Sequence, residues 1–519
     1  MADLASGMLP RGSMGVSRGS GYGAGPGSRH VRMLIPLKAG EPIYGQIYRF
    51  VRAQILAGRL PAGARLPSTR AWALQLGVSR TTVLQAFEQL AAEGYVQGVT
   101  GSATVVAADL PDSLGRTKAA DGSGAAQAVP ALSKYAARLL AETEHRPPDP
   151  PIAKQPGHVD FHYGNRIAID FPHRAWHTLV SRRAARAVPS GAPGGGHMAL
   201  REALAAHLHR TRAVRCNPAQ VVIVNGSQQA LDLVTRLLVD TGAPVVIENP
   251  QYHGARQTFR AAGARLIPCP VDGDGLDVTA LPRSPARVAL VYVTPSHQFP
   301  TGTVLPLARR LALIEWARAR QAFILEDDYD GELRYDSRPI EAVQSLDTTG
   351  RVIYMGTVSK ALTPELRIGY VVLPQSLVSP FLAAKWVADL FAPTAPQMVL
   401  AEFFRAGHYD RHLRRLREIN ARRRGALMTA AREQLADRVA IGGVSAGLHA
   451  MLWLPTVPIV ELPLLVECAS QLGVTLYPVT PYYLGQPTRS GVLAGYSSLS
   501  EHEIREGIAL FGQALRSRW

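Results

Sequence analysis

Lys360 is the residue in the second half of the chain whose surroundings most clearly suggest chemistry. It ends the run Thr357-Val358-Ser359-Lys360, which follows the apolar segment 352–355. A lysine beside small hydroxyl residues at the carboxyl end of a strand can form a Schiff base with a carbonyl ligand, provided that its pKa is lowered. The lone alternative from this pattern is an ordinary surface lysine.

Carboxylates follow a second apolar segment, 322–325, in the sequence Glu326-Asp327-Asp328-Tyr329-Asp330. Open α/β sheets bind ligands at the carboxyl ends of their strands. One of these acidic groups could therefore pair with a pyridine nitrogen of a ligand. Asp327, Asp328 and Asp330 are all candidates from sequence alone.

A phosphate site is suggested by Asn225-Gly226-Ser227-Gln228, which joins the apolar segment 221–224 to a helical pattern. The N-terminus of a helix offers unpaired N–H groups to an anion, and Gly and Ser leave room for it. The three segments thus describe a lysine, an acid and an anion cradle, each following a predicted strand.

Short apolar runs alternate with helical patterns from about residue 156 onward, which predicts an α/β fold with a mostly parallel sheet and helices on both faces. From about residue 400, a long basic helix over 409–434 precedes mixed strands and helices, and this predicts a smaller α+β subdomain. The six runs that we interpret as strands are 221–224, 245–247, 287–293, 322–325, 352–355 and 368–373.

The front of the chain has a different pattern, which is typical of a winged helix-turn-helix. Apolar residues recur every four positions from Ile43 to Ile55, and Ser68 and Ser79 are good N-caps for two further helices. The second helix carries Ala71, Leu74 and Leu76. Residues 96–106 then read as a two-stranded ribbon that turns at 100–102.

In such a motif the last helix lies in the major groove and presents its N-terminal residues to base edges, while the preceding helix start and the ribbon tip approach phosphates. A module used only for protein contacts is the alternative, and Arg80 could instead form a salt bridge on a solvated face. The residues that we expect at DNA are Arg65, Ser68, Arg70, Ser79, Arg80, Thr81, Thr82 and Gly101.

Charge supports this division of the chain. The net charge is +16, and residues 1–105 carry 11 Lys and Arg against four Asp and Glu. A basic front segment fits a polyanionic partner such as DNA. With 47% hydrophobic and 18% charged residues, the chain is globular rather than disordered or collagen-like.

Several classes of protein are excluded by what the sequence lacks. The three cysteines are far apart, which argues against a disulfide scaffold and a cysteine zinc site, and we predict no metal. No apolar leader or membrane-length segment is present, so we expect no membrane association and a cytoplasmic location. We predict four regions: a disordered leader 1–38, a winged helix 39–107, a linker 108–155 with a short helix near 132–142, and a large domain 156–519.

Two resemblances follow from these motifs. The stretch LPSTRAWALQLGVSRTTVLQAFEQLAAEGYV (66–96) resembles the winged helix of GntR-type bacterial regulators. TPSHQFPTG (294–302), EDDYD (326–330) and the GT-x-SK run (356–360) resemble fold-type I aminotransferases, which use pyridoxal 5′-phosphate (PLP). Together they are similar to the MocR/GabR family of PLP-dependent transcriptional regulators. This implies a double-stranded DNA operator, a possible amine or amino-acid effector, and a head-to-tail homodimer.

The family resemblance also implies residue roles. Lys360 would form the Schiff base with PLP, Asp327 would pair with the pyridinium nitrogen, Tyr329 would bond the phenolic oxygen and Tyr252 would stack on the ring, unless Tyr252 is a core residue. The residues expected around the phosphate are Gly226, Ser227, Gln228, Ser359 and Arg367.

Two positions depart from the pattern of aminotransferases. Phe299 stands where these enzymes usually have an asparagine that helps to hold the phenolic oxygen; the regulators commonly have Phe here. Pro481 stands where relatives place an arginine that grips a substrate carboxylate. Either another arginine, such as Arg256 or Arg489, substitutes for it, or the site does not bind an ordinary α-amino carboxylate. We therefore expect a regulator with little or no turnover, and the alternative is an active aminotransferase with a DNA-binding head.

Overall fold

The computed structural model describes residues 35, 38, 40–99, 103–108, 131–143, 157–163, 170–184, 194–284, 287–335 and 340–519. Most of the expected leader, and Gly101 with the turn 100–102, lie outside the described residues. The chain divides into two compact units, Met1–Val129 and Pro130–Trp519. Within the described ranges, we find no helix with the length and apolar character needed to cross a membrane.

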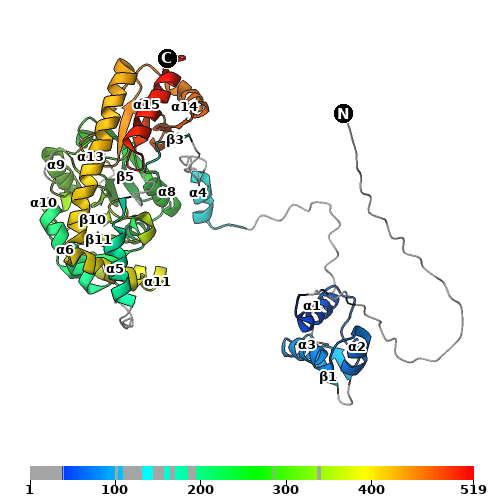
Figure 1. Cartoon of the computed structure of the whole chain (residues 1–519). Helices are drawn as coiled ribbons and strands as arrows, with labels where there is room; N and C mark the ends of the chain where they lie inside the picture. Colours follow the sequence, from blue (N-terminus) through cyan, green and yellow to red (C-terminus); the bar gives the residue numbers. More distant parts are fainter. Residues whose placement is uncertain are drawn as a thin grey trace, which may run out of the picture. The chain divides into compact units, whose positions relative to one another are not determined.

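The first unit is a winged helix-turn-helix (Figure 1). Its elements are α1 (Ile43–Leu56), α2 (Thr69–Leu76), α3 (Arg80–Ala92), β1 (Val96–Val99) and β2 (Ala103–Val106), and the two strands pair antiparallel. Gly77 ends α2 in the left-handed conformation, with φ +66°, which allows the tight turn into α3. Trp72 and Ala73 form the buried face of α2, and Leu74 is 87% exposed. The expectation that Ala71, Leu74 and Leu76 form the apolar face of this helix was therefore wrong.

The second unit contains an eight-stranded sheet in the order β4-β11-β10-β9-β8-β5-β6-β7. Neighbouring strands from β10 to β6 are parallel, while β11 runs antiparallel to both β10 and β4. The predicted mostly parallel sheet is therefore confirmed. Its strands are β4 (Val221–Val224), β5 (Pro244–Asn249), β6 (Arg265–Asp272), β7 (Gly275–Leu276), β8 (Leu290–Val293), β9 (Phe323–Asp328), β10 (Val352–Thr357) and β11 (Gly369–Val372).

Helices cover both faces of this sheet, because the strands carry apolar side chains on both faces. One face packs against α7 (Ser227–Leu238), α8 (His253–Ala262) and α11 (Gln375–Asp389). The opposite face packs against α5 (His173–Ala184), α6 (Met198–Arg212), α9 (Leu307–Ala319), α10 (Val343–Leu346), α12 (Thr394–Arg405) and the first half of α13 (His408–Leu435).

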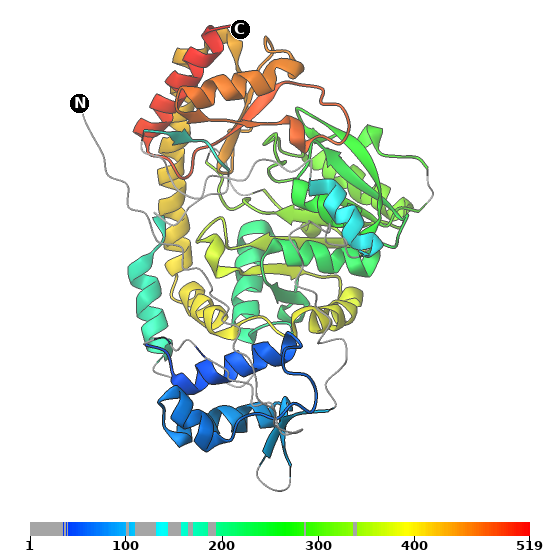
Figure 2. The same cartoon turned by 90° about the vertical axis from the view of Figure 1, so that its right-hand side faces the viewer.

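A second, antiparallel sheet follows in the order β12-β13-β16-β15. Helix α13 continues from the main sheet to this one, where α15 lies along it (Figure 2). The expected smaller α+β region therefore exists, although α12 belongs to the core of the main sheet. Its elements are β12 (Ala440–Gly442), β13 (His449–Trp453), α14 (Leu462–Gln471), β15 (Tyr477–Pro478), β16 (Gly491–Gly495) and α15 (Glu501–Arg516), with β14 (Val474–Thr475) paired to β3 (Val159–Asp160).

The segment expected to be a linker contains α4 (Lys134–Thr143), close to the helix predicted there. This helix lies against α8 in the second unit, as both Figures 1 and 2 show. The end of the segment is thus fastened to the large unit, which shortens the part that can act as a linker.

Candidate cofactor site

A cavity of about 220 Å³ opens at one edge of the main sheet. The carboxyl ends of β4, β8, β9 and β10 meet there, and the antiparallel β11 brings the residues that precede it to the same edge. All nine residues predicted to bind the cofactor line the cavity. Its lining is Tyr163, Gly226, Ser227, Gln228, Tyr252, Tyr292, Thr294, Phe299, Asp327, Tyr329, Thr357, Ser359, Lys360, Pro364 and Arg367.

Lys360 lies in this cavity with its Nζ 4.5 Å from the centre of the Tyr163 ring. Burial lowers the pKa of the lysine, and the nearby charges of Asp330 and Asp327 oppose that shift. A lowered pKa increases the fraction of neutral amine, which is the form that attacks a carbonyl carbon. The expected Schiff-base lysine therefore has a suitable environment.

Asp327 is the carboxylate of the acidic run that faces the cavity. Strand residues alternate between the two faces of a sheet, so Asp327 lies on the side of α7 and α8 and Asp328 on the other side. The Tyr292 hydroxyl donates to Asp327 Oδ2 at 2.8 Å, while Oδ1 is buried with no hydrogen-bond partner in the described part of the chain. Burial raises the pKa of Asp327 to about 7. A cationic N–H placed at Oδ1 would lower it again.

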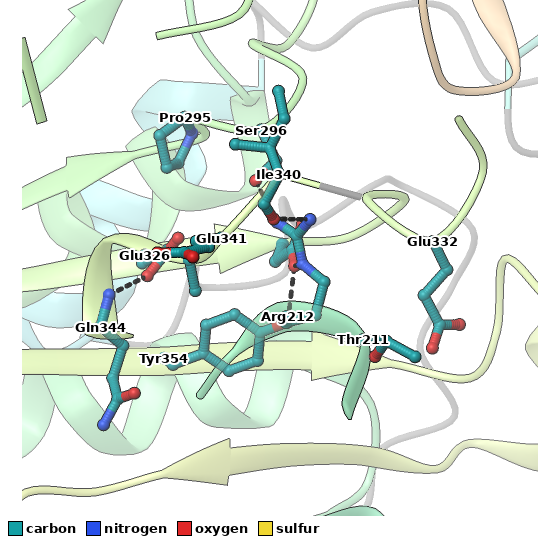
Figure 3. Close-up of polar contacts among 12 residues, drawn as sticks. Thr211, Arg212, Pro295, Ser296, Glu326, Glu332, Ile340, Glu341, Gln344 and Tyr354 are labelled. Atoms are coloured by element: carbon teal, nitrogen blue, oxygen red, sulfur yellow. Dashed lines mark hydrogen bonds and ion pairs between the residues drawn. The ribbon is translucent and has the colours of Figure 1, made fainter. Parts of the chain in front are cut away.

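Asp328 and Asp330 have other partners. Arg212 Nε donates to Asp328 Oδ2 at 2.7 Å, and the Tyr354 hydroxyl donates to the same oxygen at 2.6 Å. Figure 3 shows this arginine beside Ser296 and Ile340, to which it also donates. Asp330 Oδ2 lies 2.9 Å from His297 Nδ1. Of the three candidate acids, only Asp327 is in the cavity lining.

The anion cradle is formed by Gly226, Arg367 and the N-terminus of α7. Gly226 is the N-cap of α7, with φ +82° and no side-chain cap on the first N–H groups of the helix. A Cβ at Gly226 would lie 2.8 Å from the Arg367 guanidinium, so only glycine allows the arginine to lie over the helix end. A guanidinium above free N–H groups binds a phosphate dianion well.

Aromatic rings form another part of the cavity wall. Tyr252 lines the cavity and is 36% exposed, so it is not a core residue. Its ring lies 5.9 Å from that of Phe299, and Phe299 in turn packs 5.3 Å from Tyr482. The unpaired Oδ1 of Asp327, the cradle and this wall together suit a flat, phosphorylated, basic ring with a carbonyl group, which is the chemistry of PLP.

Residues 43–106 match the family of bacterial regulatory proteins called the gntR family, and residues 168–478 match aminotransferase class I and II. The chain is 36% identical over 480 residues to the probable rhizopine catabolism regulatory protein MocR of Rhizobium meliloti, covering 92% of this chain and 94% of that protein. It belongs to the MocR-type family of HTH-type transcriptional regulators. It is also 30% identical over 487 residues to the pyridoxine biosynthesis regulator PdxR of Corynebacterium glutamicum, covering 93% of this chain and 98% of that protein.

The large unit of this MocR-type protein also resembles solved aminotransferases. Pyrococcus horikoshii kynurenine aminotransferase, solved in complex with PMP, superposes with a TM-score of 0.65 at 26% identity. The match covers 75% of this chain and 95% of the aminotransferase. The expected fold-type I architecture is therefore confirmed.

The structure also places the two arginines that could replace a carboxylate-binding arginine at Pro481. Arg256 Nη1 donates to the backbone oxygens of Tyr483, at 3.1 Å, and Pro481, at 3.4 Å. The Arg489 guanidinium stacks 4.0 Å above the Trp453 ring. Neither lines the cavity, and Arg367 is the arginine that does so within the described ranges.

Three functional candidates were missed from sequence. Tyr292 lies inside an apolar strand pattern and reads as a core residue, and Tyr163 precedes the main alternating pattern. His297 is part of the TPSHQFPTG motif, yet only the structure shows that it lies behind Tyr329, 3.1 Å from the hydroxyl.

A metal site is not required to explain the buried histidines near the cavity. His297, Asp330 and His449 each offer a ligand atom within 4.8 Å of the others. However, His297 and Asp330 already contact each other, and His449 Nε2 lies 3.0 Å from the Pro300 oxygen. The expectation of no metal remains a prediction.

In the winged helix, two of the predicted DNA residues, Ser68 and Ser79, are helix N-caps. Ser68 Oγ accepts from the Ala71 N–H at 3.2 Å, and Ser79 Oγ accepts from the Thr82 N–H at 3.1 Å. The Ser79 and Thr82 hydroxyls also lie 2.7 Å apart. Capping shapes the start of α2 and α3, where the exposed candidates gather: Arg65, Arg70, Arg80 and Thr81.

Proposed function

We propose that this regulator binds operator DNA through its winged helix and holds PLP in the cavity of its large unit, and that PLP or a small amine or amino acid controls its binding to DNA. The observation that carries the proposal is one cavity that combines Lys360, the unpartnered Asp327 Oδ1 and the Arg367 cradle. A DNA-binding unit in the same chain makes regulation the function that this cavity serves best.

Each group of residues has a defined part in this proposal. PLP, when bound, supplies a carbonyl group and an electron-withdrawing ring. Lys360 would bond to the carbonyl carbon, Asp327 would accept the ring N–H, and Tyr329 would donate to the phenolic oxygen. Arg367 and the first N–H groups of α7, with Gly226, Ser227, Gln228 and Ser359 around them, hold the phosphate.

Helix α8 connects the cavity to α4, the helix that follows the winged helix along the chain. Tyr252, in the cavity wall, is the N-cap of α8. On the same helix, Arg256 and Arg260 contact the two oxygens of Glu142 in α4, at 3.1 and 3.0 Å. Glu142 is buried, so this contact fixes the end of the segment that leads back to the winged helix.

Arg256 also connects α4 to residues that pack on the aromatic wall of the cavity. Besides Glu142, it contacts the backbone oxygens of Pro481 and Tyr483, on either side of Tyr482. Tyr482 packs on Phe299, which lines the cavity. A ligand that moves this wall would therefore change how α4 packs on α8, because the Arg256 guanidinium contacts both.

We predict that Glu142→Gln uncouples the two units. The amide cannot balance two arginines, so α4 should bind α8 more weakly, while the cavity residues are unchanged. The ratio of operator affinities with and without PLP should fall toward one, with PLP affinity kept within about twofold. Asp232→Asn, which removes the partner of Arg236 in the ion pair on α7, serves as the control. A Glu142→Gln protein with the full wild-type ratio contradicts this route.

DNA contacts can be tested in the same protein. Arg80→Ala should lower affinity for the operator by about 1–3 kcal/mol if the side chain reads a guanine, because it removes a bidentate base contact. Arg70→Ala should weaken all sequences alike and flatten the salt dependence, since a phosphate contact carries no sequence information. Binding isotherms on operator and scrambled duplexes at several salt concentrations separate the two. Equal losses on both duplexes for Arg80→Ala would show a phosphate contact instead.

We further propose a head-to-tail homodimer in the cytoplasm, on the basis of the family resemblance. An active aminotransferase with a DNA-binding head is the second candidate, because every predicted cofactor residue lines the cavity. The regulator is favoured because neither Arg256 nor Arg489 lines the cavity, and because Phe299 replaces the asparagine of the enzymes.

A further inference from the structure

His297 lies behind Tyr329, on the side away from the cavity lining. Its Nδ1 is 3.1 Å from the Tyr329 hydroxyl and 2.9 Å from Asp330 Oδ2, and its Nε2 is 3.2 Å from the backbone oxygen of Gly443. The His297 side chain is fully buried, and that of Asp330 is 1% exposed. The tyrosine expected to face the phenolic oxygen of PLP is therefore backed by a buried histidine–carboxylate pair.

The acceptors around the ring define how it is protonated. Asp330 Oδ2 and the Gly443 carbonyl both accept hydrogen bonds, and they face opposite nitrogens of the ring. A histidine donates from both nitrogens only when both carry protons. In that state Nδ1–H reaches Asp330 and also points at the Tyr329 oxygen, so that oxygen accepts and its own proton must point elsewhere.

Two glycines make room for this arrangement. A Cβ at Gly447 would lie 2.2 Å from the His297 ring and 2.5 Å from Asp330, and a Cβ at Gly302 would lie 2.9 Å from His297 Nε2. Both glycines have positive φ, +79° and +71°. Backbone from two separate loops thus closes directly onto the ring, and the histidine has little freedom to turn.

The loop that carries His297 is itself fixed. Glu248 accepts from the Thr294 N–H at 3.1 Å and the Thr294 hydroxyl at 2.6 Å, and from Gln298 Nε2 at 3.2 Å. Phe299, in the same loop, has no polar group to offer the cofactor. Of the two side chains that hold the phenolic oxygen in aminotransferases, only the tyrosine therefore remains at this site.

We infer that His297 is a positioning residue, which holds the Tyr329 hydroxyl as a donor toward the cofactor's phenolic oxygen, with Asp330 keeping Nδ1 protonated. This inference rests on the proposed binding of PLP. It explains why a regulator that has lost the asparagine donor can still fix the phenolic oxygen: the remaining donor is oriented from behind.

Other charged and titratable groups around Tyr329 come from separate elements. Asp327 from β9 and Lys360 after β10 line the cavity, and Tyr163 lies after β3. His449 from β13 packs 4.9 Å from the His297 ring, and burial, followed by His297 and Lys360, keeps its pKa well below the usual range. Burial and the Asp330 charge raise the pKa of Tyr329, so its proton stays on the oxygen.

The test is a pH titration of the visible absorption of PLP bound to the full-length protein. His297→Gln should raise the midpoint by about one to two pH units, because Tyr329 can then turn its proton away from the phenolic oxygen and the protonated Schiff base is favoured. Tyr329→Phe should raise it similarly. In the Tyr329→Phe background, His297→Gln should add little, since the two act as one unit.

Asp330→Asn is the decisive variant. Simple removal of an anion near the Schiff base would lower the midpoint. If Asp330 instead keeps His297 Nδ1 protonated, its loss lets Nδ1 accept the tyrosine proton, and the midpoint rises. A lowered or unchanged midpoint in Asp330→Asn overturns the inference, as does a His297→Gln protein that titrates like wild type. If wild-type protein itself shows no visible band with PLP, the proposed function has failed instead.

Discussion

Lys360→Ala should abolish the covalent adduct that sodium borohydride forms in PLP-loaded protein. Lys360 is the lysine in the cavity lining, and the lowered pKa of its amine makes it reactive toward a carbonyl group. The variant should also lose the visible band. The phosphate cradle of Gly226 and Arg367 should still bind PLP, with lower affinity than in the wild-type protein. Mass spectrometry of the reduced protein gives the readout.

Lys134→Ala is the matched control for this experiment, because Lys134 is exposed on α4 and does not line the cavity. Its adduct should be as abundant as in wild type. A reduced adduct of normal abundance in Lys360→Ala would assign the Schiff base to another lysine and overturn the site.

The second large effect concerns catalysis: PLP-loaded protein should turn over amino acids very slowly or not at all. A carboxylate gripped by a bidentate arginine is both bound and oriented, and Pro481 cannot provide this. Each charge-assisted hydrogen bond that is lost removes about 1.5–3 kcal/mol. Poor orientation costs on the order of 100-fold in rate. Arg256 is held by Glu142 and two backbone oxygens, and Arg489 by Trp453, so neither lies at the cavity.

Half-transamination measures this directly, by following the loss of the visible band with a panel of amino acids and amines. Little or slow conversion is expected for common amino acids, with PLP still bound. Multiple turnovers at ordinary aminotransferase rates, with a keto-acid acceptor present, would instead make the enzyme with a DNA-binding head the better description.

Much of the cofactor site could be predicted because its residues lie in short segments at strand ends. The glycine-serine turn before α7 and the lysine after β10 carry their chemistry in local sequence, and a parallel sheet brings such segments together. Tyr292 could not be found in this way. It lies within the apolar run of β8, and only the pairing of β8 with β9 shows that its hydroxyl reaches Asp327.

The choice among Asp327, Asp328 and Asp330 also needed the fold. Alternation along a strand predicts that adjacent aspartates face opposite sides, but not which side carries the cavity. Strand β6 was missed for a different reason. Pro268 and Pro270 argue against a central strand, because proline cannot donate to the ladder, yet β6 pairs with β5 near the edge of the sheet.

Long-range ion pairs were equally invisible to sequence. Glu142 lies in a stretch that reads as a linker, and nothing local marks it as the partner of Arg256 and Arg260. The buried face of α2 was predicted wrongly because an eight-residue helix has too few turns to show a clear apolar period. Trp72 determines which side of the helix packs.

The central claim is that the occupancy of the cavity controls DNA binding, and one measurement tests it most directly. Full-length protein is stripped of PLP and reloaded, and its affinity is measured for a duplex that it selects from random-sequence DNA, with Lys360→Ala measured in parallel. We expect PLP to change wild-type affinity at least about fivefold, the lower end of typical coupling between sites, and to change that of Lys360→Ala much less. Equal affinities of stripped and reloaded wild-type protein, with the visible band confirming that PLP is bound, would contradict the account.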